Sequence, residues 1–195
     1  MSYIQCVATS TQVVLTSDGR VSGPIEIRRE DYKKIDRINK QVAVAYAGNK
    51  FLCELIIRDL KEKIKDNYES ANVDIIYDTI MDICVKNLGK HPDDKVQLLI
   101  GGIRNNGKLG IKTISTNNDY DTKDYIPEEN QISYVNATSD GAYTNVLEDK
   151  LNTLFSNKPT ADITEIYKVM NDTSRYMASI DNSVNERIFR EIIKL

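Results

Sequence analysis

The seven-residue run Gln41–Ala47, QVAVAYA, limits the choice of fold more than any other part of the sequence. A strand at the surface of a protein alternates apolar and polar residues, whereas this run is apolar on both of its faces. It therefore predicts a strand that is covered on both sides. Such a strand belongs inside a layered protein, and other elements of the chain must supply the covering layers.

Four segments have apolar residues at helical spacing with charged residues between them. The first two follow the buried strand, at Leu52–Ile64 and Val73–Leu88, and Gly89 ends the second. A third helix is expected to start near Ser139, and a fourth to cover Ile163–Met177. Because each helix has a single apolar stripe, we expect the helices to cover sheets from the outside.

Short segments rich in β-branched and apolar residues predict the remaining strands. We expect them at residues 3–8, 12–17, Val96–Ile103, Leu109–Ile114, Ile132–Ala137 and Arg187–Ile193. The tripeptide Asn105-Asn106-Gly107 between the third and fourth of these is a strong hairpin signal. The order of elements fits a pair of sheets between two helical layers, and no repeat or linker divides the chain.

Composition argues against several functions. The chain has 26 Lys and Arg against 29 Asp and Glu, a formal charge of −3, with no basic footprint for nucleic acid or an anionic membrane. No apolar run approaches the roughly 20 residues of a membrane span, and no signal peptide is evident. Cys6, Cys53 and Cys84 lie in apolar runs, which predicts buried thiols in a reducing compartment. We therefore expect a cytoplasmic protein without a metal or other cofactor.

The only histidine, His91, lies in the loop-like stretch GKHPDDK. A Ser-His-Asp or Cys-His site would have to be built on it, and no G-x-S-x-G elbow supports such a site. If the protein is a hydrolase, we expect its base to be another group.

Four positions near the start of the chain are regularly spaced. Ser2, Asp18 and Lys34 follow one another at intervals of 16 residues, and Gly48 comes 14 residues later. Taken singly, Asp18 is by default a turn residue, Lys34 a solvated charge and Gly48 the end of a strand. Their common register is what suggests a site.

The same register resembles that of a known family. Counted from Ser2 as the first mature residue, the chain aligns without a gap with β subunits of the proteasome, whose nucleophile is an N-terminal Thr. The matching motifs are Ser17-Asp18-Gly19-Arg20, Lys33-Lys34-Ile35 with Ile38-Asn39, and Ala47-Gly48. The chain thus resembles an N-terminal-nucleophile hydrolase of the bacterial proteasome-like, HslV-like type. The resemblance implies an α+β fold, a four-layer αββα sandwich, in one domain over residues 1–195.

The resemblance also implies a catalytic site. A serine hydroxyl needs a base, and on the first residue of a chain the α-amino group, with an ordinary pKa of about 7.7–8.0, can serve. Lys34 would lower the pKa of that amine by charge repulsion, Asp18 would hold Lys34, and the N–H of Gly48 would stabilise the oxyanion. Serine in place of threonine loses the methyl group that limits χ1.

Beyond residue 115 the resemblance is looser. Ser139 is either the serine that the family places beside the nucleophile or only the N-cap of its helix. Asp181 matches a second supporting acid; the serine expected three residues later is replaced by Val184, and Ser183 could substitute after a shift of one residue. Arg20 is interpreted as structural.

The family's substrate pocket corresponds here to Val21, Tyr32, Tyr46, Lys50 and Glu54. Tyr46 at the floor narrows the pocket, so we expect a preference for small or medium side chains before the cleaved bond.

Activity depends on Met1, because the nitrogen of Ser2 is an amide while Met1 is attached. Serine at position two is small enough for a methionine aminopeptidase to remove Met1, and we expect it to do so. The resemblance then implies a homo-oligomeric ring that degrades peptides or unfolded proteins. Whether an ATPase cap feeds this ring is left open. The alternatives are a catalytically silent, ring-forming subunit and an N-terminal-nucleophile amidase that acts on a small molecule.

Overall fold

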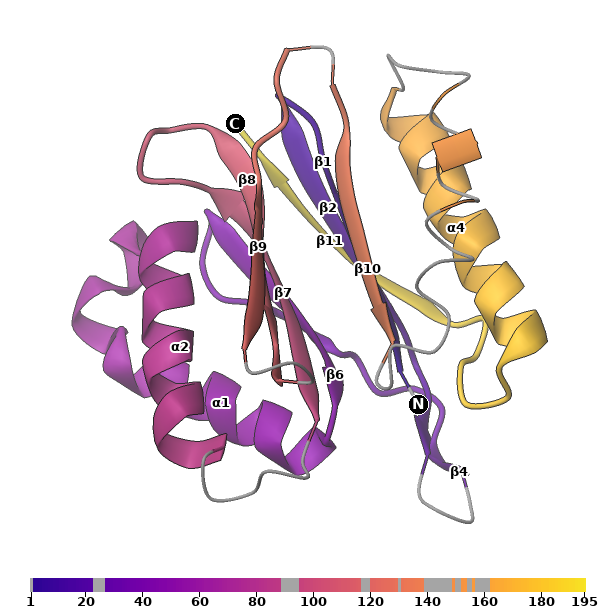
Figure 1. Cartoon of the computed structure of the whole chain (residues 1–195), viewed down its shortest axis with the longest axis horizontal. Coiled ribbons are helices and arrows are strands. Elements are labelled where there is room, and N and C mark those ends of the chain that lie inside the picture. Colours follow the sequence, from indigo (N-terminus) through magenta and orange to yellow (C-terminus); the bar gives the residue numbers. More distant parts are fainter. Residues whose placement is uncertain are drawn as a thin grey trace.

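Two antiparallel β-sheets face each other, and helices cover their outer faces (Figure 1). The structure is a computed structural model, and it describes residues 2–22, 27–88, 95–116, 120–129, 131–138, 149, 152, 153, 156 and 162–195. The layers are helices, sheet, sheet and helix, which confirms the four-layer αββα sandwich.

The larger sheet has five strands. Their order is β5 (Ile35–Arg37), β6 (Val42–Gly48), β7 (Val96–Ile103), β8 (Leu109–Ser115) and β9 (Asp121–Tyr125). Its outer face packs against α1 (Lys50–Lys63) and α2 (Val73–Leu88), which are joined by the 3₁₀ helix η1 (Lys65–Ser70).

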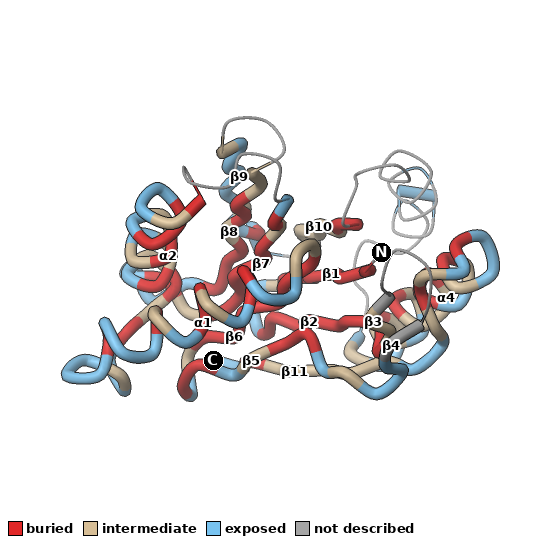
Figure 2. The backbone as a smooth tube through the Cα atoms, turned by 90° about the horizontal axis from the view of Figure 1, so that it is seen from below, coloured by how far each residue is buried: buried red, intermediate tan, exposed pale blue. Residues whose placement is uncertain are grey.

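Strand β6 is buried on both faces, as its sequence predicts. Val42, Val44 and Tyr46 pack toward α1 and α2, while the alternate residues Ala43, Ala45 and Ala47 face the other sheet. The two sheets approach closely, because a Cβ added to Gly101 of β7 would lie 2.7 Å from a methyl carbon of Val13. Figure 2 shows that the buried residues gather between the sheets and beneath α1 and α2.

The smaller sheet has four strands. Their order is β10 (Ser133–Thr138), β1 (Tyr3–Ala8), β2 (Gln12–Asp18) and β11 (Ile188–Lys194). Its outer face is covered by α4 (Ile163–Ile180), which starts with a capping box formed by Asp162 and Glu165. Gln5 of β1 also links the sheet to α4, because its Nε2 donates to Met170 O at 2.9 Å and to Ser174 Oγ at 2.8 Å.

The expected elements within the described residues are present, and their bounds lie within three residues of the predicted ones. Four strands of the structure were not predicted: β5, β9, and the paired strands β3 (Val21–Ser22) and β4 (Ile27–Arg29). Three of these strands have two or three residues, and β9 is largely exposed and charged, so no apolar pattern marks it. The start of the expected third helix, the end at Gly89 and His91 lie outside the described residues.

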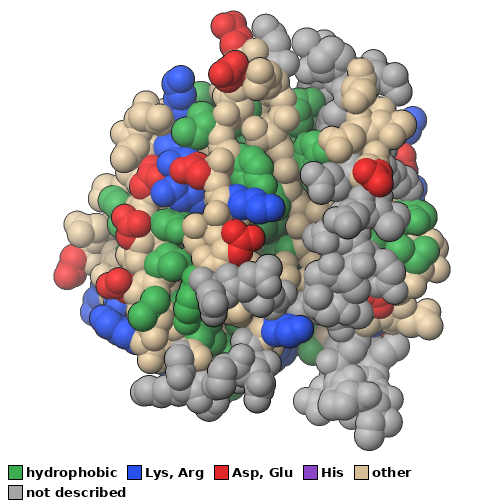
Figure 3. Space-filling model, in the orientation of Figure 1, with side chains coloured by type: hydrophobic (Ala, Val, Ile, Leu, Met, Phe, Trp, Pro, Cys, Tyr) green, Lys and Arg blue, Asp and Glu red, His purple; other side chains and the backbone are tan. Residues whose placement is uncertain are grey.

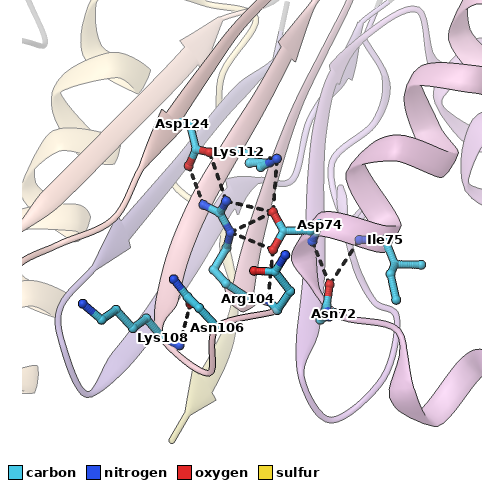
Figure 4. Close-up of polar contacts among 9 residues, drawn as sticks. Asn72, Asp74, Ile75, Arg104, Asn106, Lys108, Lys112 and Asp124 are labelled. Atoms are coloured by element: carbon cyan, nitrogen blue, oxygen red, sulfur yellow. Dashed lines mark hydrogen bonds and ion pairs between the residues drawn. The ribbon is translucent and has the colours of Figure 1, made fainter.

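A charged cluster ties α2 to the end of the larger sheet (Figure 4). Arg104, just after β7, lies between Asp74 of α2 and Asp124 of β9. Its Nε is 3.0 Å from Asp74 Oδ1, its Nη2 is 3.0 Å from Asp124 Oδ2, and Lys112 Nζ is 3.1 Å from Asp74 Oδ1. Among the described residues on the face seen in Figure 3, basic and acidic side chains are interspersed.

Candidate active site

A buried ion pair lies at the end of β2. Asp18 is the last residue of that strand, and Lys34 comes just before β5 on the neighbouring sheet. Lys34 Nζ is 2.6 Å from Asp18 Oδ1, and the two side chains are 3% and 0% exposed. The sequence register therefore brings together two residues that would each be solvated by default.

The Asp18 carboxylate is fixed by two further donors. The backbone N–H of Tyr3 donates to Oδ1 at 2.8 Å, and the N–H of Arg20 donates to Oδ2 at 2.8 Å. Hydrogen bonds to a charged acceptor are stronger than neutral ones, so three donors hold this carboxylate in one orientation. The contact with Tyr3 also places the start of β1, and hence Ser2, beside the ion pair.

Ser2 is itself buried, with 8% of its surface exposed. It directly precedes Tyr3, whose amide is held by Asp18. The alternate residues of β1, Ile4 and Cys6, face the second sheet. Side chains alternate along a strand, so the Ser2 side chain is expected on the same face as Ile4 and Cys6, toward the larger sheet.

Burial lowers the pKa of Lys34, and the attraction of Asp18 opposes this shift without cancelling it. A charged ammonium loses hydration inside a protein, which favours the neutral amine. The Lys34 ammonium is held by a carboxylate, but it gives up its proton more readily than that of an ordinary lysine.

Gly48 can only be glycine. Its φ is +112°, and an added Cβ would lie 2.0 Å from the backbone oxygen of Lys95. The next residue, Asn49, caps α1 by accepting a hydrogen bond from the N–H of Leu52 at 3.3 Å. The positive end of the α1 dipole is thus one residue from the Gly48 N–H, which favours negative charge nearby.

Asp181 follows α4 and is 7% exposed. Its Oδ1 accepts from the N–H and the hydroxyl of Ser183, at 2.8 and 2.5 Å. Its Oδ2 is buried and has no hydrogen-bond partner among the described residues. Val184 belongs to the same apolar cluster as Tyr3 and Met177, which brings this loop to the start of β1. Ser139 lies outside the described residues.

Four of the five expected pocket residues form a ladder beside α1. The Tyr32 hydroxyl is 3.3 Å from that of Tyr46 and donates to Glu54 at 2.8 Å, and Lys50 Nζ is 3.1 Å from Glu54. Burial raises the pKa of both tyrosines, so their hydroxyls stay protonated at neutral pH. The fifth residue, Val21, is half-buried on β3, where it pairs with Arg29 rather than with the ladder.

Two contributions to the site could not be found from side-chain patterns. The amide of Tyr3 is a backbone donor, which any residue would supply. Asn185 lies in a polar stretch, SIDNSVN, that signals only a turn, yet its side chain contacts the backbone beside Asp18. In the described ranges, no helix has the length and apolarity to cross a membrane, and no group of three or more His, Cys, Asp or Glu is placed to hold a metal.

Comparison with known proteins adds a family and a fold. A family model described as "Proteasome subunit" matches residues 4–126, which is more than half of the chain. No curated protein sequence matches. Among solved structures, the chain is similar to eukaryotic HslV from Trypanosoma brucei, with 16% sequence identity and a TM-score of 0.67 over 99% of each chain. At that identity, the structural likeness shows the fold alone.

Proposed function

Because the chain belongs to the proteasome subunit family, we propose that it is a peptidase subunit whose nucleophile is Ser2, made N-terminal by removal of Met1. The observation that carries this proposal is the buried pair of Lys34 and Asp18, with Asp18 bonded to the residue that follows Ser2. A buried ion pair is not by itself stabilising. We infer that this pair is retained because it serves the chemistry of the neighbouring Ser2.

The proposed reaction is amide hydrolysis in two stages. The free α-amine of Ser2 takes the hydroxyl proton, and Oγ attacks the carbonyl carbon of the substrate. The oxyanion is stabilised by the N–H of Gly48, a donor typically worth about 3–4 kcal/mol. The ammonium then protonates the leaving amine, which departs and leaves an ester on Ser2. Water, activated by the same amine, hydrolyses the ester and restores the site.

Lys34 and Asp181 support the amine in this scheme. The charge on Lys34 disfavours a second cation and so lowers the pKa of the α-amine toward neutral pH. Asp181 Oδ2 is a buried acceptor that lacks a donor among the described residues. Buried acceptors are normally satisfied, and the α-ammonium exposed by loss of Met1 would be a suitable donor. Ser139 is proposed to assist at the same place.

We propose that the Tyr32–Tyr46 ladder forms the floor of the pocket for the residue before the cleaved bond. Tyr46 is 5% exposed, and its hydroxyl also lies 3.3 Å from Asp36 Oδ2, so the ring is held in place. A fixed tyrosine at the floor leaves room for small or medium side chains, with Lys50, Glu54 and Val21 at the sides. Faster cleavage after Phe than after Ala in short peptides would overturn this preference.

The family further supports a homo-oligomeric ring in the cytosol, in which the sites act on peptides and unfolded protein. An ATPase cap that feeds such a ring is part of this proposal. The second candidate is a silent ring-forming subunit, which would result if Met1 were retained, because the nitrogen of Ser2 would then be an amide and could not take a proton.

Intact mass and a covalent probe separate the two candidates. The natively expressed protein is weighed and then incubated with a peptide epoxyketone, which needs both the hydroxyl and the free α-amine to form its adduct. We expect a chain that lacks Met1 and gains one probe, and no adduct on Ser2→Ala. A full-length chain without an adduct would establish the silent subunit instead.

A further inference from the structure

An asparagine side chain joins the loop after α4 to the turn after β2. Asn185 Oδ1 accepts from the N–H of Gly19 at 2.8 Å, and its Nδ2 donates to the backbone oxygen of Glu30 at 3.0 Å. Gly19 is the residue after Asp18, and its own oxygen accepts from the N–H of Tyr32 at 2.9 Å. Asn185 therefore links three segments that carry candidate site residues.

The atoms around Gly19 are closely packed. A Cβ added to Gly19 would lie 2.8 Å from the oxygen of Glu30, and 3.2 and 3.3 Å from carbons of Phe189 and Arg187. The backbone of Gly19 is thus enclosed by the residues that Asn185 contacts and by the start of β11. A small displacement of Asn185 must be transmitted to the turn, because densely packed atoms cannot absorb it.

Arg20 forms a second link in the same place. Its N–H bonds Asp18 Oδ2, while its guanidinium bonds the oxygen of Asn182 and the Glu30 carboxylate, the latter at 2.6 Å. The Glu30 side chain is 58% exposed, so this ion pair is weak. The two bonds of Asn185, by contrast, both end on backbone groups that the fold already fixes.

We propose that Asn185 is a positioning residue for the site, holding the turn that aims Asp18 against the loop that carries Asp181. As a role in catalysis, this inference rests on the proposed peptidase function. The two acids come from opposite ends of the chain, at the end of β2 and after α4. Asn185 keeps them in one arrangement, so that Lys34 and the amine of Ser2 are held by acids that do not move relative to each other.

Two variants test the proposal. Asn185→Ala removes both bonds, and Asn185→Asp keeps an acceptor for Gly19 while placing a carboxylate oxygen against the Glu30 carbonyl. We expect kcat to fall about tenfold or more in both, with KM within about twofold, because misplaced catalytic groups mainly affect the chemical step. The control is Asn105→Ala, in the exposed β7–β8 turn, and should match the wild type. Unchanged kcat in both variants, or a loss of thermal stability alone, would overturn the proposal.

A second readout does not need activity. Amide hydrogen exchange of Tyr3 and Arg20 reports on the Asp18 carboxylate, to which both N–H groups are bonded. We expect both amides to exchange faster in Asn185→Ala, and Tyr46, whose N–H bonds the Lys34 oxygen, to keep its protection. If the wild type fails to react with the epoxyketone, the peptidase proposal fails while this exchange experiment still decides the role of Asn185: unchanged protection at Tyr3 and Arg20 would refute it.

Discussion

Two ionic sites among the described residues, Lys34 with Asp18 and the Arg104 cluster, are built differently. At the end of β2, Lys34 and Asp18 form an isolated pair whose side chains are 3% and 0% exposed. The register of β6 and β7 pairs Gly48 with Val96 and Val42 with Gly102, so Arg104 lies at the other end of the larger sheet. There, two cations and two carboxylates compensate one another (Figure 4).

In both sites burial disfavours the charged form of the side chains, but the resulting shift in pKa differs. For Lys34 burial outweighs the attraction of Asp18, and the pKa is lowered. For Arg104 the hydrogen bonds to Asp124 and Asp74 outweigh burial, and the pKa is raised. For Asp74 burial is likewise outweighed, by Arg104 above all, and the pKa falls to about 2. In the first site the charged form of the cation is disfavoured relative to water, and in the second the charged forms of Arg104 and Asp74 are favoured.

The largest effect is expected from Lys34→Met. Peptide hydrolysis should fall about 1,000-fold or more, because both the charge that tunes the amine and the partner of Asp18 are lost. The free energy of unfolding should fall by about 3–5 kcal/mol, since a buried carboxylate is left without its cation. Initial rates and urea unfolding measure the two effects.

The neighbouring lysine provides a matched control. Lys33 is 42% exposed and pairs with Glu191 at 2.5 Å. Exposed pairs contribute about 0–1 kcal/mol, so Lys33→Met should change neither activity nor stability by much. If Lys34→Met kept a tenth of the wild-type activity, Lys34 would not have the catalytic role that distinguishes its site from the Arg104 cluster.

Arg104→Met tests the structural site. It leaves Lys112 as the one cation of this cluster, and we expect a loss of about 3 kcal/mol in the free energy of unfolding. Below its unfolding temperature the variant should keep the wild-type kcat, because the site at Gly48 lies at the other end of the sheet. Urea unfolding and peptide hydrolysis on the same sample check both statements. A fall in kcat at unchanged stability would contradict the assignment of this cluster to structure.

The two sites also differ in how far sequence could reveal them. Ser2, Asp18 and Lys34 stand at a fixed spacing early in the chain, and the structure places Lys34 and Asp18 in direct contact. In the other cluster, Arg104 follows β7 and joins residues 30 and 20 positions away, on helix α2 and strand β9, and β9 has no apolar pattern. Asn185 was missed for the same reason: its partners lie 155 and 166 residues away. Local periodicity predicts layers, whereas such contacts depend on how the layers meet.

The response to acid gives a smaller effect. The pKa of Asp74 is about 2 in the folded chain against an ordinary 3.8. The folded state therefore binds fewer protons between these values, so the contribution of Asp74 is present above about pH 4 and is lost as the pH falls toward 2. The difference in unfolding free energy between wild type and Asp74→Asn should be about 1 kcal/mol smaller at pH 3 than at pH 6. An equal difference at both pH values would show that Asp74 does not titrate as described.

The smallest effect is expected from Asp124→Asn, and it decides whether enclosure or the number of ion pairs sets the strength of the cluster. Asp74 and Asp124 bind the same Arg104, but their side chains are 15% and 49% exposed. Each carboxylate pairs with both Arg104 and Lys112, so if the number of ion pairs alone mattered, the two Asp→Asn variants would cost the same. Water competes at the exposed carboxylate, so Asp124→Asn should cost about 0.5 kcal/mol or less, and Asp74→Asn should cost more. Urea unfolding at pH 6 compares them, and equal losses would show that the exposed carboxylate is as important as the enclosed one.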